Sequence, residues 1–141
     1  MTITIQAIDL LAMPEVRSLL TTSDLPTEDI GDPAIALFGA FERDSLVGVI
    51  GLQSCDGVGL LRSLAVAPHH RDRGVARLLC EHVIEAARAM SSLWLLTTAA
   101  RDYFTRYAFE VVPREEAPAA VRATAQFTSL CPSSAHVMRR R

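Results

Sequence analysis

The chain has 141 residues, a formal net charge of -2 at pH 7 and 14 basic residues, all of them arginine. Because it has no lysine, the chain excludes Schiff-base enzymes, pyridoxal-phosphate enzymes and a P-loop, each of which needs an ε-amine. Arginine side chains and backbone N–H groups can still bind phosphate, whereas the slightly negative charge argues against a nucleic-acid-binding protein.

Hydrophobic residues make up 50% of the chain, which excludes a disordered protein. No apolar stretch approaches the roughly 20 residues of a membrane-spanning helix, and the start of the chain lacks the pattern of a secretion leader. The length predicts a single domain over residues 1–141 that buries its own core. Three widely spaced cysteines without metal-ligand spacing indicate a reduced, cytoplasmic protein with no metal site: Cys55, Cys80 and Cys131.

The first half of the chain predicts a strand, a helix, an acidic loop and three further strands. Alternating apolar residues predict the first strand at residues 2–8, and Asp9 follows as the N-cap of a helix. Proline, glycine and acidic residues predict a loop at residues 22–33. The turns between the three strands are too short for a parallel crossover, so we expect an antiparallel meander at residues 35–42, 46–53 and 59–67.

In the second half of the chain, helices alternate with strands. Apolar residues at helical spacing predict a long amphipathic helix at residues 74–90. The elements expected after it are a strand at 93–98, a helix at 100–107, a strand at 109–112, a helix at 118–127 and a last strand at 135–138. This order predicts an α/β or α+β domain with a mixed sheet.

The most informative segment joins the third meander strand to the long helix and reads Pro68-His69-His70-Arg71-Asp72-Arg73-Gly74-Val75-Ala76. At the start of a helix four backbone N–H groups lack partners and the helix dipole is positive, so this turn predicts an anion site. Gly74 and the small Ala76 let a bulky anion approach the backbone. Positive charge surrounds it from Arg71, Arg73 and Arg77. A pyrophosphate is the anion that we expect here.

The spacing R-x-x-G-x-A after a strand ending in V-x-P resembles the signature of the GNAT (GCN5-related) N-acetyltransferase superfamily. The predicted order of elements is similar as well. The resemblance implies a mixed, mostly antiparallel central sheet of about six or seven strands flanked by helices, with acetyl-CoA (coenzyme A) as the cofactor. Four segments resemble, more narrowly, the small GNAT proteins associated with bacterial arsenic resistance: residues 25–29 (LPTED), 61–68 (LRSLAVAP), 95–98 (LLTT) and 129–132 (SLCP).

The resemblance also implies which residues contact the cofactor. The strands at residues 61–67 and 93–98 would splay, leaving backbone groups of Leu64 and Val66 free to bind the pantetheine arm. The same donors would polarise the thioester carbonyl as an oxyanion site, which makes Val66 a candidate catalytic residue. The candidate cofactor-binding residues are Leu64, Ala65, Val66, Arg71, Asp72, Arg73, Gly74, Val75, Ala76, Arg77, Thr98, Phe104 and Tyr107.

In many GNAT proteins a tyrosine five residues before the phenylalanine of a G-F pair protonates the leaving thiolate. Counting back from Phe109 gives Phe104, and Ala108 takes the place of the glycine, so the usual acid is absent. Tyr103 is a candidate catalytic acid, but it neighbours the usual position without occupying it, and a packing role is the alternative. Water can also serve as the acid, and proximity can supply much of the rate.

On the acceptor side, the superfamily usually shapes its pocket from the loop after the first helix and from the tail. The loop supplies Asp24, Glu28 and Asp29, which either hold a substrate ammonium or are solvated. Arg62, beside the proposed acyl site, would need an anionic partner if it points inward. Asp24, Glu28 and Arg62 are therefore the candidate substrate-binding residues, and an acceptor with a free amine and an acidic group would satisfy both kinds of charge.

We therefore expect an acetyl-CoA-dependent N-acetyltransferase that acts on the amine of a small polar, amino-acid-like molecule, with a link to arsenic or toxic-compound resistance. Two alternatives stay open. The missing tyrosine favours a catalytically weak CoA-binding domain that acts as a sensor or interaction module, and acetylation of a protein N-terminus or side chain is the other. No nucleic-acid or membrane partner is expected, and an exposed last strand would let two copies pair as a homodimer.

Overall fold

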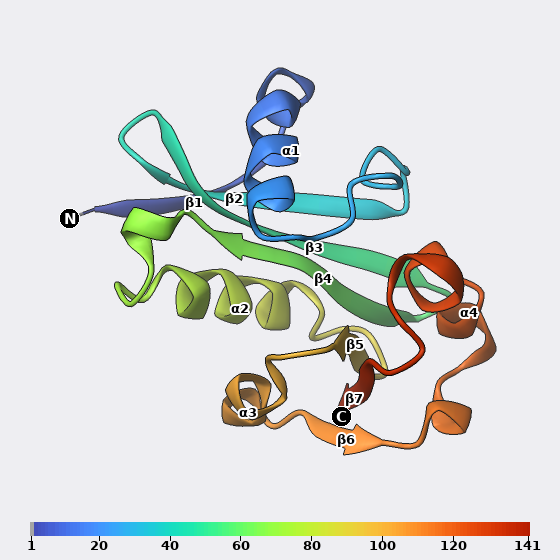
Figure 1. Cartoon of the computed structure of the whole chain (residues 1–141). Coiled ribbons are helices and arrows are strands. Elements are labelled where there is room, and N and C mark those ends of the chain that lie inside the picture. Colours follow the sequence, from blue (N-terminus) through green and yellow to red (C-terminus); the bar gives the residue numbers. More distant parts are fainter. Residues whose placement is uncertain (1) are drawn as a thin grey trace.

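The computed structural model of the chain describes residues 2–141, which form a seven-stranded sheet in the order β1-β2-β3-β4-β5-β7-β6 (Figure 1). The strands are β1 (Ile3–Ala7), β2 (Ile35–Glu42), β3 (Ser45–Cys55), β4 (Val58–Val66), β5 (Leu93–Thr97), β6 (Glu110–Val112) and β7 (His136–Arg140). Neighbouring strands are antiparallel except for β4 and β5, which are parallel. The expected mixed, mostly antiparallel sheet flanked by helices is confirmed.

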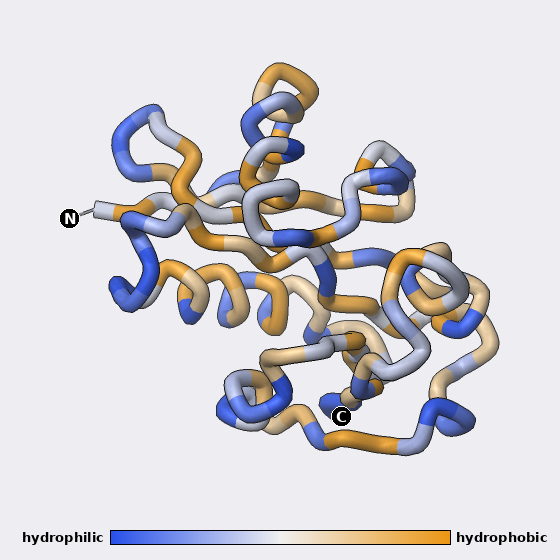
Figure 2. The backbone as a smooth tube through the Cα atoms, viewed as in Figure 1, coloured by the Kyte–Doolittle hydropathy of each residue, from blue (hydrophilic) through white to orange (hydrophobic). Residues whose placement is uncertain are grey.

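The helices are α1 (Met13–Thr22), α2 (Val75–Ala86), α3 (Arg101–Phe104) and α4 (Ala119–Arg122). The first two cover opposite faces of the central strands (Figure 1). Val49 and Ala65 belong to the core under α1, whereas Ile50 and Leu61 belong to the core under α2. Because successive residues of a strand point to opposite faces, β3 and β4 are buried on both sides. Figure 2 accordingly shows hydrophobic residues running along these strands.

One extra residue in β4 breaks the regular pairing with β3. Val49 lies opposite Ala65 and Gly51 lies opposite Arg62, so Ile50 faces two residues of β4. The first of them, Ser63, has a φ of 58°, the left-handed conformation typical of a β-bulge. Such a bulge bends its strand, and here it lies where β4 turns away from β5.

The pairing of β4 with β5 covers only Gly59 opposite Leu93 and Leu60 opposite Trp94. Beyond this point the two strands splay, as expected from the sequence. The backbone of β4 from the bulge onward therefore faces a gap on the β5 side. Both cavities described below contain residues of this part of β4.

The last strand of the chain lies inside the sheet. β7 pairs with β5 on one side and with β6 on the other. We expected an exposed last strand that would let two copies pair. The last strand is not exposed, because β7 already forms its hydrogen bonds with β5 and β6, so this argument for a homodimer is wrong. The edge strands are β1 and β6.

Several predicted boundaries differ from the observed ones. Asp9 caps a 3-10 turn, Leu10–Ala12, which runs directly into α1. α2 ends at Ala86 instead of residue 90. The helix predicted at residues 100–107 consists of α3 and a 3-10 turn, Thr105–Tyr107, which stops at Ala108 in the left-handed conformation (φ 66°). The helix predicted at residues 118–127 is shorter, and a π-turn, Gln126–Leu130, follows it.

Residues 2–141 contain neither a membrane-spanning helix nor a metal-binding cluster. No helix in this part of the chain combines the length and apolarity that a membrane span requires. The same residues contain no group of histidine, cysteine, aspartate and glutamate side chains arranged to hold a metal ion.

Candidate active site

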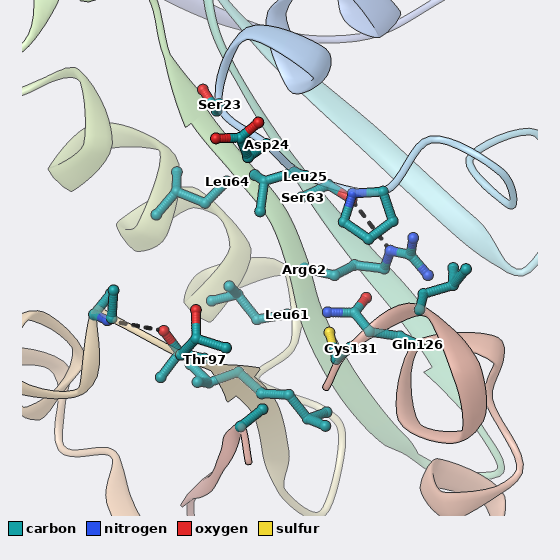
Figure 3. Close-up of a pocket in the computed structure, with 18 of the residues that line it drawn as sticks. Ser23, Asp24, Leu25, Leu61, Arg62, Ser63, Leu64, Thr97, Gln126 and Cys131 are labelled. Carbon is teal, nitrogen blue, oxygen red and sulfur yellow. Dashed lines mark hydrogen bonds between the residues drawn. The ribbon is translucent and has the colours of Figure 1, made fainter. Parts of the chain in front are cut away.

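A cavity of about 780 Å³ lies where the splayed strands meet the loop after α1 (Figure 3). Residues 21–28 form one wall, residues 61–64 of β4 form the second, and residues 95–104 form the third. The C-terminal segment closes it with Gln126, Leu130, Cys131, Pro132 and Ala135. Four segments that are far apart in the sequence therefore converge on one space.

A second cavity, of about 880 Å³, lies at the start of α2. It is lined by Val66, His70, Arg71, Asp72, Arg73, Gly74, Val75, Ala76, Arg77, Glu81, Tyr103, Arg106 and Tyr107. Tyr103 lines both cavities, so the two spaces adjoin at this side chain.

The structure gathers nearly all of the predicted cofactor-binding residues around these two spaces. The second cavity contains the whole turn from Arg71 to Arg77 together with Val66 and Tyr107. Leu64, Thr98 and Phe104 line the first cavity. Ala65 lines neither, because its side chain is 4% exposed and packs in the core under α1.

The start of α2 fits an anion of the size of a diphosphate. Gly74, the N-cap residue, has a φ of 80° and supplies no side chain to the free N–H groups of the first turn. A Cβ atom at Gly74 would have the Arg77 guanidinium as its nearest neighbour, at 3.9 Å, so the space in front of the backbone is open. Arg71 Nε donates to the Val66 carbonyl oxygen at 3.3 Å, which ties the turn to the end of β4. Open N–H groups ringed by guanidinium groups are what phosphate requires.

His70 lines the second cavity, although the sequence analysis gave it no role. Its Nε2 lies 3.1 Å from Glu42 Oε1, and the hydrogen bond from His70 lowers the pKa of the Glu42 carboxyl. Its Nδ1 is buried and has no hydrogen-bond partner within residues 2–141. No sequence pattern signals this contact, because Glu42 ends β2 and His70 lies 28 positions further along.

One backbone donor of β4 faces the gap between the splayed strands. The N–H of Ala67 donates to the Val47 carbonyl at 2.8 Å, on the β3 side. Because successive N–H groups along a strand point to opposite edges, the N–H of Val66 points toward β5. Val66 also lines the second cavity, so this donor is placed beside the predicted cofactor path.

Two tyrosines and a buried thiol form a cluster at the junction of the cavities. The hydroxyl oxygens of Tyr103 and Tyr107 are 2.7 Å apart, and both side chains pack against the core cluster that contains Cys80. Burial raises the pKa of Tyr103 and raises that of Cys80 to about 12. Both groups are therefore protonated at neutral pH. Phe104 is 6% exposed and packs against Phe109.

The acceptor side holds a buried ion pair. Arg62 is 2% exposed, and its two terminal nitrogens each donate to one carboxylate oxygen of Asp29. Gln53 Oε1 accepts a further bond from Arg62 at 2.9 Å. The expected anionic partner of Arg62 is therefore supplied by the chain, and an acidic acceptor is not needed to explain an inward-pointing arginine.

The other predicted acceptor residues lie at the same cavity. Asp24 and Glu28 line its loop wall and are exposed, and Asp24 has a φ of 56°. Sequence reasoning missed Gln126, which is 6% exposed, and gave Cys131 no role, although both side chains line this cavity. A π-turn, often found at functional sites, carries Gln126. It leaves no periodic signal in the sequence.

A basic cavity and an acidic one thus meet at the splayed parallel strands and provide separate places for an anionic and a cationic group. The model of the acetyltransferase (GNAT) family matches residues 5–109. The chain therefore belongs to the GNAT acetyltransferase family. Acetyl-CoA is the cofactor of this family, so the expected cofactor is confirmed at the level of the family.

Solved structures of similar fold are numerous. N-acetylglutamate synthase from Neisseria gonorrhoeae, complexed with coenzyme A and N-acetyl-glutamate, is 20% identical with a TM-score of 0.85; the match covers 100% of this chain and 35% of the synthase chain. Rv2747 from Mycobacterium tuberculosis, in complex with CoA and NLQ, is 17% identical, with a TM-score of 0.81 and coverage of 97% and 98%. The ribosomal-protein-S18-alanine N-acetyltransferase from Escherichia coli is 18% identical, with a TM-score of 0.77 and coverage of 99% and 93%.

These likenesses describe the fold. The chain spans about a third of the length of the Neisseria synthase. No curated protein matches the sequence.

Proposed function

We propose that residues 1–141 act as one N-acetyltransferase domain, which transfers the acetyl group of acetyl-CoA to the amine of a small polar, amino-acid-like molecule. The observation that carries this proposal is the junction of the two cavities at Tyr103. The basic cavity suits the phosphate end of a donor, and the cavity next to it carries carboxylates that suit an amine. Strands β6 and β7 complete the same sheet as β1 to β5, which supports a single domain.

Acetyl-CoA would supply an activated acetyl group as a thioester. Arg71, Arg73 and Arg77, together with the open backbone N–H groups after Gly74, would hold its pyrophosphate. The N–H of Val66 would donate to the acetyl carbonyl oxygen and stabilise the negative charge that develops there.

Tyr103 is the proposed acid. Its hydroxyl is protonated at neutral pH because burial raises its pKa, and it lies at the junction where the thiol would leave. Tyr107 holds that hydroxyl from the side of the second cavity. Tyr103 would protonate the leaving thiolate, which Phe104, at the usual position of the acid, cannot do.

Asp24 and Glu28 would hold the acceptor ammonium and receive its proton through water, and Arg62 would line the cavity behind them. The narrower likeness to arsenic-resistance GNAT proteins supports a toxic amino-acid-like acceptor. Its four segments, residues 25–29, 61–68, 95–98 and 129–132, all contribute to the wall of the first cavity. Sequence similarity that concentrates at an acceptor cavity indicates a shared class of acceptor. The cytoplasmic location inferred from the cysteines stays a prediction.

The second candidate is a CoA-binding module with weak catalysis, which the phenylalanine at residue 104 favours. The test is thiol release from acetyl-CoA over a panel of amino acids, amines and N-terminal peptides, alongside calorimetric titration with coenzyme A. Turnover that requires one class of amine supports the enzyme. Micromolar coenzyme A binding with no turnover on any amine would favour the module, and failure to bind coenzyme A would overturn both.

A further inference from the structure

The ion pair between Arg62 and Asp29 joins two walls of the acceptor cavity. Arg62 lies on β4 directly before the bulge at Ser63, and its Nε lies 3.2 Å from the Ser63 hydroxyl. Asp29 directly follows the loop residues that form the opposite wall. The pair is bidentate, and the side chains of Arg62 and Asp29 are 1% and 16% exposed. A buried bidentate pair of this kind fixes both the distance and the angle between β4 and the loop.

The loop wall has few other anchors. Residues 24–34 contain no helix or strand. The side chain of Ile30 is buried, and the N–H of Leu25 donates to the Leu20 carbonyl at 2.9 Å. Between these two points two side-chain bonds join the loop to the rest of the fold: an exposed bond from Arg17 to the Thr27 carbonyl, at 3.2 Å, and the bond from Arg62 to Asp29. Exposed bonds contribute little, so the buried pair dominates the placement of residues 26–28.

The pair also acts on the C-terminal segment that closes the cavity. Burial raises the pKa of the Cys131 thiol, and Arg62 and Asp29 then act on that pKa in opposite directions. Gln126 and Cys131 line this cavity together with Arg62, and Figure 3 shows the side chains of Gln126 and Arg62 next to each other. Loop, bulge and C-terminal segment thus meet at one charged pair.

We propose that Arg62 and Asp29 are a positioning pair that sets the shape of the acceptor cavity by holding the loop wall, residues 24–28, against the β4 bulge. This inference rests on the proposed function for its effect on acceptors. Because Asp29 neutralises Arg62, the charges that the cavity offers to an acceptor are those of Asp24 and Glu28. Arg62 acts through Asp29 and is not itself a catalytic residue.

The test compares the wild type with Asp29→Asn, which keeps the size of the side chain but removes the charge that Arg62 requires. The matched control is Asp32→Asn, in the same loop, because asparagine can still accept the bond that Asp32 Oδ1 accepts from the Ala34 N–H at 2.8 Å. A third variant, Arg62→Lys, keeps the positive charge but cannot form the bidentate pair with Asp29. Its effects should be intermediate between those of Asp29→Asn and the wild type. Circular dichroism and melting temperature show which variants fold.

Two readouts follow. Amide hydrogen exchange at Leu25, Thr27 and Glu28 should be about tenfold or more faster in Asp29→Asn, with α2 unchanged, because the loop opens locally without global unfolding. The KM for the acceptor should rise about tenfold with the coenzyme A Kd unchanged, because the cofactor cavity is built from other residues. Asp32→Asn should behave like the wild type in both measurements.

The exchange experiment does not depend on turnover. Unchanged exchange at Leu25, Thr27 and Glu28 in folded Asp29→Asn or Arg62→Lys would overturn the positioning pair. If the wild type acetylates no amine but Asp29→Asn still shows fast local exchange, the proposed function fails and the pair stands as a loop anchor. If Asp29→Asn does not fold, Arg62→Lys decides between these outcomes by the same measurement.

Discussion

The hydroxyl oxygens of Tyr103 and Tyr107 lie 2.7 Å apart, one turn of helix from each other, beside the buried thiol of Cys80. The pair lies at the junction of the two cavities, one residue from the position where many GNAT proteins carry their tyrosine acid. Under the proposed function, Tyr103 would offer its phenolic proton to the leaving thiolate from this neighbouring position.

Tyr103→Phe should lower kcat about 100-fold with little change in the KM for acetyl-CoA, because a positioned general acid contributes on that order. Tyr107→Phe should have a smaller effect, since Tyr107 acts through Tyr103. Steady-state kinetics over a pH series measures both. Because the pKa of Tyr103 is raised above its ordinary 10.0, loss of this acid should lower kcat only above pH 10.

The double variant Tyr103→Phe/Phe104→Tyr is the control for that prediction. Phe104 lines the first cavity, so a hydroxyl added there should recover part of the lost kcat. A Tyr103→Phe enzyme with wild-type kcat would instead show that water is the acid.

Replacing Arg71 and Arg73 together by glutamine should weaken coenzyme A binding about 100-fold, because each charge-assisted bond to phosphate contributes roughly 1.5–3 kcal/mol. Calorimetric titration measures the Kd, which should also rise with salt as charges are screened. The control Arg43→Gln/Arg122→Gln removes the same charge from exposed positions outside both cavities. Equal affinity in the two double variants would contradict the phosphate site at the start of α2.

Gly74→Ala separates backbone strain from ligand contact. Gly74 has a φ of 80° and Gly57, in a turn between β3 and β4, has a φ of 88°, and a Cβ atom clashes at neither position. Each alanine should lower the free energy of unfolding by about 1–2 kcal/mol, the cost of the left-handed conformation. Only Gly74→Ala should also weaken coenzyme A binding. Thermal melts measure the loss of stability and calorimetry measures coenzyme A binding. Equally weakened binding in both variants would contradict a ligand contact specific to Gly74.

The three thiols should react slowly at neutral pH. Burial raises the pKa of each of them, that of Cys80 to about 12, and the thiolate is the reactive form. With iodoacetamide at pH 7.5, Cys131 should react first because it is the most exposed, and its rate should rise as the pH rises toward 9. Mass spectrometry of time points measures this order. Rapid labelling of Cys80 in the folded protein would show that the tyrosine cluster is more open than described.

The sequence alone predicted the seven strands and both long helices, because each has a clear apolar period and the turns carry glycine, proline or aspartate. It also predicted the turn from Arg71 to Arg77, since a helix start, glycine and arginine give a local signal for anion binding. These features depend on neighbours in the chain.

Pairs that form only in three dimensions were not predictable. Arg62 and Asp29 are 33 positions apart, and the sequence led us to expect an acidic acceptor where the chain provides its own carboxylate. The contact of His70 with Glu42, 28 positions apart, is of the same kind. The short α3 also escaped prediction, because Ala108 adopts a left-handed conformation that alanine rarely takes and so ends the helix without a glycine.

The place of β7 between β5 and β6 bears on how the protein is made. Within the described residues β6 hydrogen-bonds to no strand except β7, which leaves the ribosome later. During synthesis β6 and the β7-facing edge of β5 therefore stay unpaired until His136–Arg140 has been made. The sheet is complete only when this segment pairs with both strands. A nascent chain stalled before that segment would contain the whole turn from Arg71 to Arg77, but its sheet would lack β7 and β6 would be unpaired.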